Sequence, residues 1–342
     1  MTPLRVLVCE DSGVYAAALR RTLEYDGDIK VLAVATTAEE ALAALPRLTP
    51  DLLTMDLELP GMDGLSAVEE IMGSRPMPIL VLSSHVGSRS AKTGAALAAG
   101  ALDALPKEDL DLRDPAGMAG AAFRHRIRTL SRARVIRHPR SRLGIRSRAP
   151  VVGRRASVVG ICASAGGPQL LMYLLAALPA DYPVPVLIVQ HMAAGFTEGL
   201  VQWLDQAVPM PVRLARQGIR APSGASLAPE GAHLTIGADG RLRLDRHAAA
   251  GAHRPSGDVL LTSIAAAAST AGVAVVLTGM GSDGAAGAAA VRRSGGLAIA
   301  QDELSSAVFG MPKAARESGV DLVLPPAEIA ACLLALRHQP LP

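Results

Sequence analysis

The stretch VVGICASAGGPQLL, residues 158–171, starts as an apolar run, turns through small residues and continues as a second apolar run. The first run has the length and composition of a buried strand, and the second has those of a helix. One serine, Ser164, stands at the tip of the strand, and Gly166 and Gly167 follow where the helix must begin. Either these glycines let the backbone approach a phosphate, or they expose the serine as a nucleophile.

Composition predicts a two-domain protein that does not insert into a membrane. The chain has 342 residues, and 50% of them are hydrophobic, which is enough for two cores. Cys9, Cys162 and Cys332 lie far apart and lack metal-ligand spacing, so we expect buried, reduced thiols. The chain opens without a charged-then-apolar signal segment, and no apolar run reaches the length of a membrane span. The expected location is therefore the cytoplasm.

An arginine-rich stretch separates two patterned halves. No acidic residue occurs between Asp114 and Asp181, whereas twelve arginines fall between Arg124 and Arg155. A nucleic-acid-binding segment can be this basic, but no aromatic residue is interleaved and no recognition-helix motif accompanies it. We therefore expect a solvated linker with a helical start and no nucleic-acid partner. The predicted organisation is a domain at 1–122, an Arg-rich linker at 123–153 and a second domain at 154–342.

The first half alternates strand and helix patterns. Strand-like runs separated by helical spacing predict a five-stranded, doubly wound parallel sheet, in which reactive groups gather at the carboxyl ends of the strands. The runs lie at residues 5–10, 30–35, 51–56, 78–84 and 101–107. The polar residues at their ends are Glu10, Asp11, Asp56, Ser83 and Lys107.

These five residue types together indicate phosphoryl-transfer chemistry. Three neighbouring carboxylates repel one another, so a divalent cation is needed, and oxygen ligands favour Mg²⁺. A hydroxyl and an ammonium beside the metal can hold phosphoryl oxygens while Asp56 accepts the phosphoryl group.

The motifs CEDS, MDLELPGMDG, VLSS and LPK resemble the response-regulator receiver family over residues 4–122. The resemblance implies that a histidine kinase phosphorylates Asp56. It also implies that Glu10 and Asp11 bind Mg²⁺ with Asp56, that Ser83 bonds a phosphoryl oxygen and that Lys107 pairs with the phosphate. Ala104-Leu105 departs from the family pattern, because many receivers carry an aromatic switch residue just before the lysine.

The second half predicts a larger, doubly wound and mostly parallel α/β hydrolytic domain. Strand-like runs lie at 157–164, 185–192, 273–278 and 296–302, and an antiparallel hairpin is expected around Asp239-Gly240. At or after the ends of these strand-like runs lie Ser164, His191 and the loop from Thr278 to Asp283.

The two glycine loops fit a hydrolase better than a nucleotide site. Neither follows the dinucleotide or phosphate-loop spacing, and no lysine follows either glycine run. Ser164 is a candidate nucleophile, with His191 as its general base and Asp283 as the carboxylate that orients the imidazole. Backbone N–H groups near Ser164 and Met280 are candidates to hold an oxyanion.

The motifs VGICASAGGP, VQHM, LTGMGSDGA and AQDELSSAVFGMP resemble the chemotaxis protein-glutamate methylesterase family (CheB) over residues 157–337. The resemblance implies Ser164, His191 and Asp283 as the triad, with the Met280 backbone at the oxyanion and no cofactor for the esterase. It implies hydrolysis of glutamyl methyl esters on the cytoplasmic helices of chemoreceptors, with release of methanol, and deamidation of receptor glutamines. Ala165 and Cys162 depart from residues common in the family.

Arginines after the second strand are candidates to border the catalytic cleft and attract an acidic receptor surface, although an ordinary solvated charge is the more usual role for each. These are Arg213, Arg216 and Arg220. Two alternatives stay open from the sequence: a serine hydrolase of the same fold that acts on another small ester, and a signalling protein whose second domain only binds partners.

Overall fold

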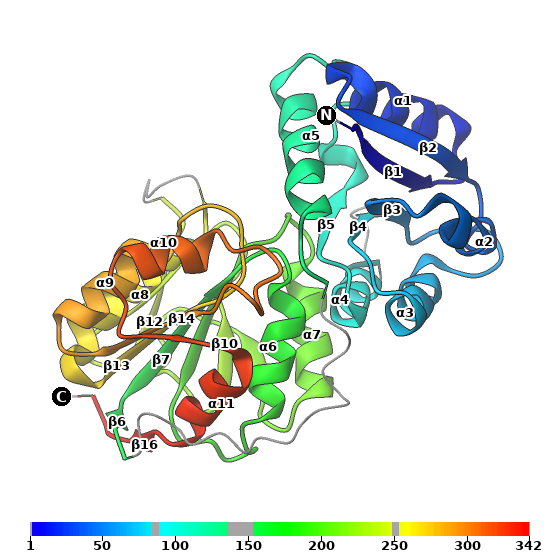
Figure 1. The fold of residues 1–342 in the computed structure, drawn as a ribbon. Helices are drawn as coiled ribbons and strands as arrows, with labels where there is room; N and C mark the ends of the chain where they lie inside the picture. The colour runs from blue at the N-terminus through cyan, green and yellow to red at the C-terminus, as the bar shows by residue number, and fades with distance from the viewer. Residues whose placement is uncertain (1, 84–88, 136–152, 248–252, 342) are drawn as a thin grey trace. The chain divides into compact units, whose positions relative to one another are not determined.

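The structure is a computed structural model that describes residues 2–83, 89–135, 153–247 and 253–341. The chain divides into two compact units. The first contains the elements from β1 to α5, and the second contains a larger sheet with its helices (Figure 1). Most of the predicted linker, residues 136–152, lies outside the described residues.

The first unit is built on a five-stranded parallel sheet in the order β2-β1-β3-β4-β5. Its central strands are almost entirely buried, because helices cover both faces and the strands are continuous apolar runs. The predicted fold of this half is confirmed. The strands are β1 (Leu4–Cys9), β2 (Ile29–Ala35), β3 (Leu52–Asp56), β4 (Ile79–Ser83) and β5 (Asp103–Pro106).

Helices α1 and α5 lie on one face of this sheet, and α2, α3 and α4 lie on the other (Figure 1). Side-chain caps begin three of them: Ser12, Thr37 and Asp63 each accept a hydrogen bond from the backbone three residues later. The helices are α1 (Gly13–Leu23), α2 (Ala38–Leu48), α3 (Gly64–Ser74), α4 (Arg89–Ala99) and α5 (Met118–Ser131).

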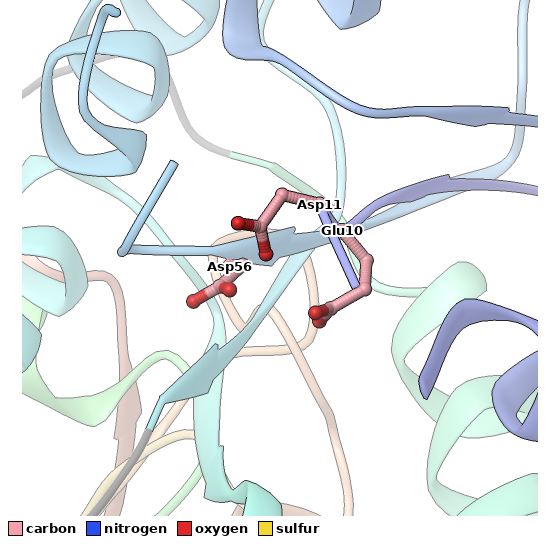
Figure 2. A group of neighbouring side chains, drawn as sticks. All are labelled: Glu10, Asp11 and Asp56. Carbon is pink, nitrogen blue, oxygen red and sulfur yellow. The ribbon is translucent and has the colours of Figure 1, made fainter. Parts of the chain in front are cut away.

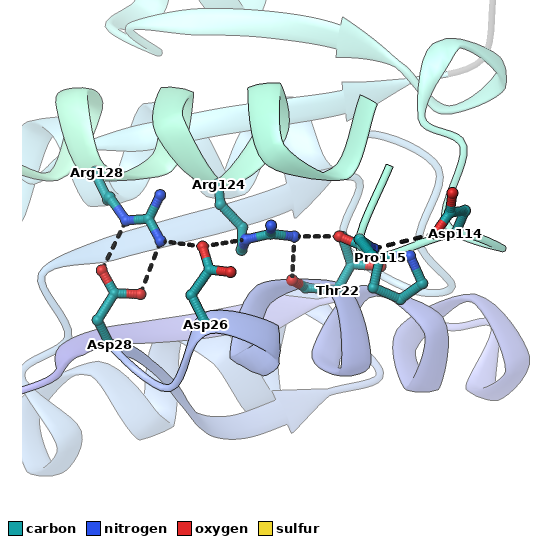
Figure 3. Close-up of polar contacts among 8 residues, drawn as sticks. Thr22, Asp26, Asp28, Asp114, Pro115, Arg124 and Arg128 are labelled. Atoms are coloured by element: carbon teal, nitrogen blue, oxygen red, sulfur yellow. Dashed lines mark hydrogen bonds and ion pairs between the residues drawn. The ribbon is translucent and has the colours of Figure 1, made fainter. Parts of the chain in front are cut away.

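Helix α5 crosses the boundary predicted at residue 122/123, so the first arginines of the predicted linker belong to a packed helix. Arg124 is only 3% exposed; its Nε donates to Asp26 at 2.7 Å, and it also donates to the carbonyl oxygens of Thr22 and Pro115 (Figure 3). Arg128 contacts both Asp26 and Asp28. Charge density along the sequence could not reveal these partners, which lie about a hundred positions earlier in the chain.

The second unit contains a seven-stranded sheet in the order β15-β14-β13-β7-β8-β10-β9. Every pair in it is parallel, so the sheet is more regular than the mostly parallel one expected. Its main strands are β7 (Val158–Ala163), β8 (Val186–Gln190), β13 (Gly272–Val276) and β14 (Leu297–Gln301). Shorter strands complete it: β9 (Val212–Leu214), β10 (Ala225–Leu227) and β15 (Leu322–Leu324).

The order of these strands determines where a site can form. The chain proceeds from β7 to β8 on one side, and later returns to place β13 on the other side of β7. In open parallel sheets the crevice used for ligands lies beyond the carboxyl ends of the strands at such a reversal. The residues that follow β7, β8 and β13 are therefore brought to one edge.

Two hydrophobic cores cover the faces of this sheet. Helices α6 (Gly167–Ala176), α7 (Thr197–Ala207) and α11 (Pro326–Leu334) contribute to one, and α8 (Gly257–Ala268), α9 (Ala285–Arg293) and α10 (Met311–Glu317) to the other (Figure 1). The predicted antiparallel hairpin is present as a separate two-stranded sheet, β11 (His233–Ile236) with β12 (Leu242–Asp245). A short parallel pair, β6 (Arg155–Ala156) with β16 (Arg337–His338), completes the strands. Within the described residues, no helix is long and apolar enough to cross a membrane.

Candidate active site and acidic cluster

An acidic cluster lies at the carboxyl edge of the first sheet. Glu10 and Asp11 follow β1, and Asp56 ends β3. One carboxylate oxygen from each lies within 4.8 Å of the others (Figure 2). Glu10 and Asp56 are buried, whereas Asp11 is exposed. Three oxygen donors at this spacing suit a hard divalent cation such as Mg²⁺, with water completing its coordination.

Lys107, the residue directly after β5, contacts two members of the acidic cluster. Its Nζ lies 2.6 Å from Asp56 Oδ2 and 2.7 Å from Glu10 Oε2. Burial alone would lower the pKa of Lys107, but these two carboxylates outweigh it and raise that pKa. Burial raises the pKa of both Asp56 and Glu10, although Lys107 opposes the shift. Three carboxyl groups share this edge with one lysine, so the site carries more formal negative charge than that lysine offsets.

Two further residues of the first unit bear on phosphoryl chemistry. Ser83 is 1% exposed, and its Oγ has no hydrogen-bond partner among the described residues. A buried hydroxyl without a partner fits a group that bonds a ligand oxygen. Tyr15 on α1 donates from its hydroxyl to the Lys107 carbonyl oxygen at 3.3 Å, and its ring centroid lies 4.9 Å from Lys107 Nζ. Thus Tyr15 supplies an aromatic ring beside Lys107, although β5 has Ala104 where many receivers have an aromatic residue.

In the second unit, Ser164 lies directly after β7, in the turn that leads into α6. Its N–H donates to the Thr278 carbonyl oxygen at 3.0 Å, and its carbonyl oxygen accepts from Gly167 N at 2.8 Å. Gly166 has a φ of 75°, in the left-handed region that glycine adopts without strain. The turn is thereby fixed to the loop that follows β13 as well as to its own helix.

His191 and Asp283 are in direct contact. The distance from His191 Nε2 to Asp283 Oδ2 is 2.8 Å, and both side chains are about nine-tenths buried. The ring of His253 stacks on the ring of His191, with centroids 4.5 Å apart and planes inclined by 21°. No hydrogen bond joins Ser164 Oγ to His191 in the described part of the chain. Because Nε2 faces Asp283, Nδ1 is the nitrogen left for a proton from the serine.

The N-terminus of α8 holds the Asp283 carboxylate. Ser256 Oγ donates to Oδ1 at 2.8 Å, Asp258 N donates to Oδ1 at 3.0 Å, and Gly257 N donates to Oδ2 at 2.5 Å. Burial alone would raise the pKa of Asp283, but His191 and these donors outweigh it and hold the pKa well below its usual range. The carboxylate is therefore ionised and can stabilise a protonated imidazole.

The loop after β13 comes close to the serine turn. A Cβ built on Gly279 would lie 2.7 Å from the Ser164 Cβ, so only glycine allows this approach. The Gly279 N–H donates to the Val308 carbonyl oxygen at 3.0 Å. The next N–H, that of Met280, donates to no other described residue, which leaves it available for an oxyanion.

Sequence reasoning missed several groups at this edge. His253, Ser256 and Gln190 were not among the predicted site residues, and only Ser256 carried a usable signal, as a serine before an apolar helical run. Gln190 joins the serine turn to the histidine turn through its side-chain amide.

The arginines expected around the cleft do not share one location. Arg220 lines a cavity with Ser157 and Pro185, which precede β7 and β8 and so lie at the amino edge of the sheet, opposite Ser164. Arg220 is therefore no longer a candidate to border the cleft, because the chain turns back after β9, and its exposed side chain fits the alternative of a solvated charge. Arg216 is exposed just beyond the carboxyl end of β9, and Arg213 lies within that strand.

The three cysteines are free and buried, as expected. Burial raises the pKa of the Cys162 thiol well above its usual value, and the side chain lies within β7. A buried, protonated thiol is a poor nucleophile, so Cys162 does not compete with Ser164 for that role.

Comparison with known proteins covers both units. The profile of the CheB methylesterase family matches residues 159–333, and that of the response regulator receiver domain matches residues 6–114. A protein-glutamate methylesterase/protein-glutamine glutaminase of Anaeromyxobacter dehalogenans is 43% identical over 340 residues, covering 98% of each chain. One from Myxococcus xanthus is 40% identical over 342 residues, covering 97% of this chain and 95% of its own.

A solved structure supports the assignment of the second unit. The crystal structure of the Thermotoga maritima CheB methylesterase catalytic domain is 38% identical, with a TM-score of 0.50, and covers 52% of this chain and 97% of its own. With a receiver profile, an esterase profile and relatives that align from end to end, the chain belongs to the CheB methylesterase family.

Proposed function

We propose that the protein is a phosphorylation-gated protein-glutamate methylesterase that also deamidates receptor glutamines. Its substrates would be glutamyl methyl esters on the cytoplasmic helices of methyl-accepting chemoreceptors, and its phosphate donor a histidine kinase of a chemotaxis-type system. The observation that carries the proposal is the contact between His191 and an ionised Asp283, at the same sheet edge as Ser164. The end-to-end likeness to proteins named for both activities supports the choice of substrate.

In the proposed reaction, Ser164 Oγ attacks the ester carbonyl carbon while His191 Nδ1 takes the hydroxyl proton. Asp283 stabilises the imidazolium, and the Met280 N–H donates to the oxyanion. Collapse of the tetrahedral intermediate breaks the bond to methoxide, which leaves as methanol with the proton from His191. Water then attacks the acyl-enzyme, with His191 again as base; the bond to Ser164 Oγ breaks, His191 returns a proton to that oxygen, and the receptor keeps a glutamate side chain. With a glutamine substrate the same steps release ammonia.

In the first unit, Asp56 would accept the phosphoryl group. Mg²⁺ held by Glu10, Asp11 and Asp56 would supply positive charge that offsets the carboxylates and the phosphoryl oxygens. Lys107 would pair with the phosphate, and the partnerless hydroxyl of Ser83 would donate to a phosphoryl oxygen. Phosphorylation would then shift an equilibrium between a less active and a more active form of the esterase.

A methanol-release assay on methylated receptor tests this function. The wild-type protein should release methanol, and Ser164→Ala should not. Release by both proteins would contradict the assignment of the nucleophile. Absence of release by the folded, phosphorylated wild-type protein would favour a non-catalytic signalling protein, and turnover of small esters alone would favour another hydrolase of this fold.

A further inference from the structure

Gln190 is a buried polar residue at the catalytic edge with no part in the reaction described above. It ends β8, directly before His191, and is 6% exposed. Its Nε2 donates two hydrogen bonds of 2.8 Å, one to the carbonyl oxygen of Ser164 and one to that of His191. Resting on the proposed function, we propose that Gln190 is a positioning residue that sets the nucleophile turn against the base turn.

One backbone hydrogen bond connects the ends of the two strands, but within the described part of the chain none joins the turns beyond it. The last ladder bond between β7 and β8 runs from His191 N to the Ala163 carbonyl oxygen, at 2.8 Å. Beyond it, the Ser164 N–H turns away to Thr278 on the other side of β7. Among the described residues, no backbone hydrogen bond joins the serine turn to the chain that follows His191. The side-chain amide of Gln190 supplies the missing connection.

One planar amide is well suited to fix two carbonyl groups. Both acceptors are bonded by the same NH₂ group, whose two hydrogens diverge at a fixed angle, so their separation is held within narrow limits. Because the group is buried, breaking either bond would leave a carbonyl without this donor and without ready access to water. The arrangement therefore resists small displacements of Ser164 relative to His191.

The amide also explains the second glycine of the turn that carries the nucleophile. A Cβ built on Gly167 would lie 2.2 Å from Gln190 Oε1 and 2.8 Å from the Ala163 Cβ. Gly166 is required by its left-handed backbone, but the requirement at Gly167 is space. The glycine pair at the start of α6 thus accommodates both the sharp turn and the Gln190 amide beside it.

A second buried glutamine makes a related contact on the other side of Ser164. Gln301 ends β14, its Oε1 accepts from Thr278 N at 2.8 Å, and its Nε2 donates to the Ser305 carbonyl oxygen at 2.8 Å. Thr278 in turn accepts from the Ser164 N–H. Side-chain amides at two strand ends therefore support the turn on both sides, but only Gln190 reaches Ser164 and His191 directly.

Gln190→Met in the full-length protein tests the positioning role, since methionine keeps the length of the side chain and removes both donors. Displacements of about 1 Å cost up to about 100-fold in rate, so we expect kcat on methylated receptor to fall about 10- to 100-fold. Because Gln190 bonds only backbone of the protein, KM should change by less than about twofold. Gln190→Glu should also lose kcat, because a carboxyl group can donate at most one of the two hydrogen bonds, and only when it is protonated.

Tyr182→Phe is the matched control. Tyr182 is buried and precedes β8, at the end of the strand opposite to Gln190. The substitution removes the 2.7 Å hydrogen bond from its hydroxyl to the Leu333 carbonyl oxygen. This variant should unfold at a temperature similar to that of Gln190→Met while keeping wild-type kcat. If Gln190→Met keeps kcat within about twofold of wild type, the proposal is overturned. The wild-type rate in the same assay separates this outcome from failure of the proposed function, which would abolish turnover in every variant.

A measurement on the wild-type protein covers the case in which the variants do not fold. In ¹H–¹⁵N spectra, both side-chain amide protons of Gln190 should exchange with solvent much more slowly than those of the exposed Gln206. Exchange as fast as that of Gln206 would show that the amide does not hold the two carbonyls, and would also overturn the proposal.

Discussion

Each unit has an aspartate beyond or at the carboxyl end of a parallel strand, but the pKa values of the two carboxyl groups are shifted in opposite directions: Asp56 ends β3, and Asp283 lies in the loop after β13. Asp56 and Asp283 both lie at the carboxyl edge of a parallel sheet. Burial raises the pKa of Asp56, which shares its site with Glu10 and Asp11. The pKa of Asp283 is lowered despite burial, because three donors from the start of α8 and His191 bond its carboxylate.

This difference matches what each unit is proposed to do. An edge with surplus negative charge attracts a divalent cation, and the same cation offsets negative charge during phosphoryl transfer. An edge with one fully hydrogen-bonded carboxylate keeps that charge in place and stabilises positive charge on the imidazole. Strand ends bring functional groups together in both units, but the neighbouring donors determine which chemistry results.

The largest expected effect is on catalysis in the second unit. Ser164→Ala and His191→Ala should each lower kcat for methanol release by about 10³-fold or more, because the three residues act as a unit. The double variant should be scarcely slower than either single one. Losses that multiply in the double variant would show that the two residues act independently.

The second largest effect is expected on phosphorylation of the first unit when Asp11, the exposed member of the proposed cation site, is removed. Asp11→Ala should not be phosphorylated at Asp56 by a small phosphodonor and Mg²⁺, because the remaining carboxylates cannot bind the cation well. Radiolabel incorporation measures this. Labelling of Asp11→Ala at the wild-type rate would show that Asp11 is not a ligand of the proposed cation. Substitution of another exposed aspartate, Asp111→Ala, is the control and should leave labelling unchanged.

Neutralising the two aspartates should change stability in opposite directions. Asp283→Asn should destabilise the second unit by about 1–3 kcal/mol, because the amide nitrogen would face backbone and hydroxyl donors. Asp56→Asn should raise the melting temperature of the first unit at neutral pH without divalent cations, because it removes a charge that burial disfavours. Calorimetry of the full-length variants measures both, and shifts of the same sign would contradict the comparison.

The pH dependence of these shifts follows from the two pKa directions. A carboxyl group with a raised folded-state pKa binds more protons when folded, so its cost to stability appears as pH rises and disappears on acidification. The advantage of Asp56→Asn should therefore shrink as pH falls through the raised pKa toward the unfolded value. The contribution of Asp283 is present above its unfolded pKa and is lost only as pH falls toward its lowered folded pKa. Calorimetry across this range should show Asp283→Asn approaching wild-type stability only in stronger acid.

The smallest expected effect is at Cys162, which lies two residues before the nucleophile. Its thiol is fully buried in β7, so Cys162→Ser should keep methanol release within a few-fold of wild type. The buried hydroxyl should cost about 1 kcal/mol in the free energy of unfolding. A loss of activity as large as that of Ser164→Ala would require a direct role for this thiol.

Strand ends could be predicted from the sequence because apolar runs and the polar residues after them are local features. That was sufficient to place Glu10, Asp56 and Lys107 together, and to select Ser164, His191 and Asp283. The catalytic roles of these residues remain predictions until the assays are done.

Other contacts depend on geometry that local patterns do not carry. Strand β13 pairs with β7 although many residues separate them in the sequence. The orientation of the first turn of α8 determines which donors reach Asp283. The stacking of His253 on His191 and the two hydrogen bonds donated by the Gln190 side chain depend on side-chain orientation. A helical start to the arginine-rich stretch was expected, but not that Arg124 and Arg128 would bond acidic partners distant in sequence (Figure 3).

Methanol release from methylated receptor, measured with and without a small phosphodonor and Mg²⁺, tests both units in one assay. We expect wild-type protein to speed up with the phosphodonor, Asp56→Asn to stay at its basal rate, and Ser164→Ala to release no methanol under either condition. An equal acceleration of Asp56→Asn and wild type, or release by Ser164→Ala, would contradict the proposed function.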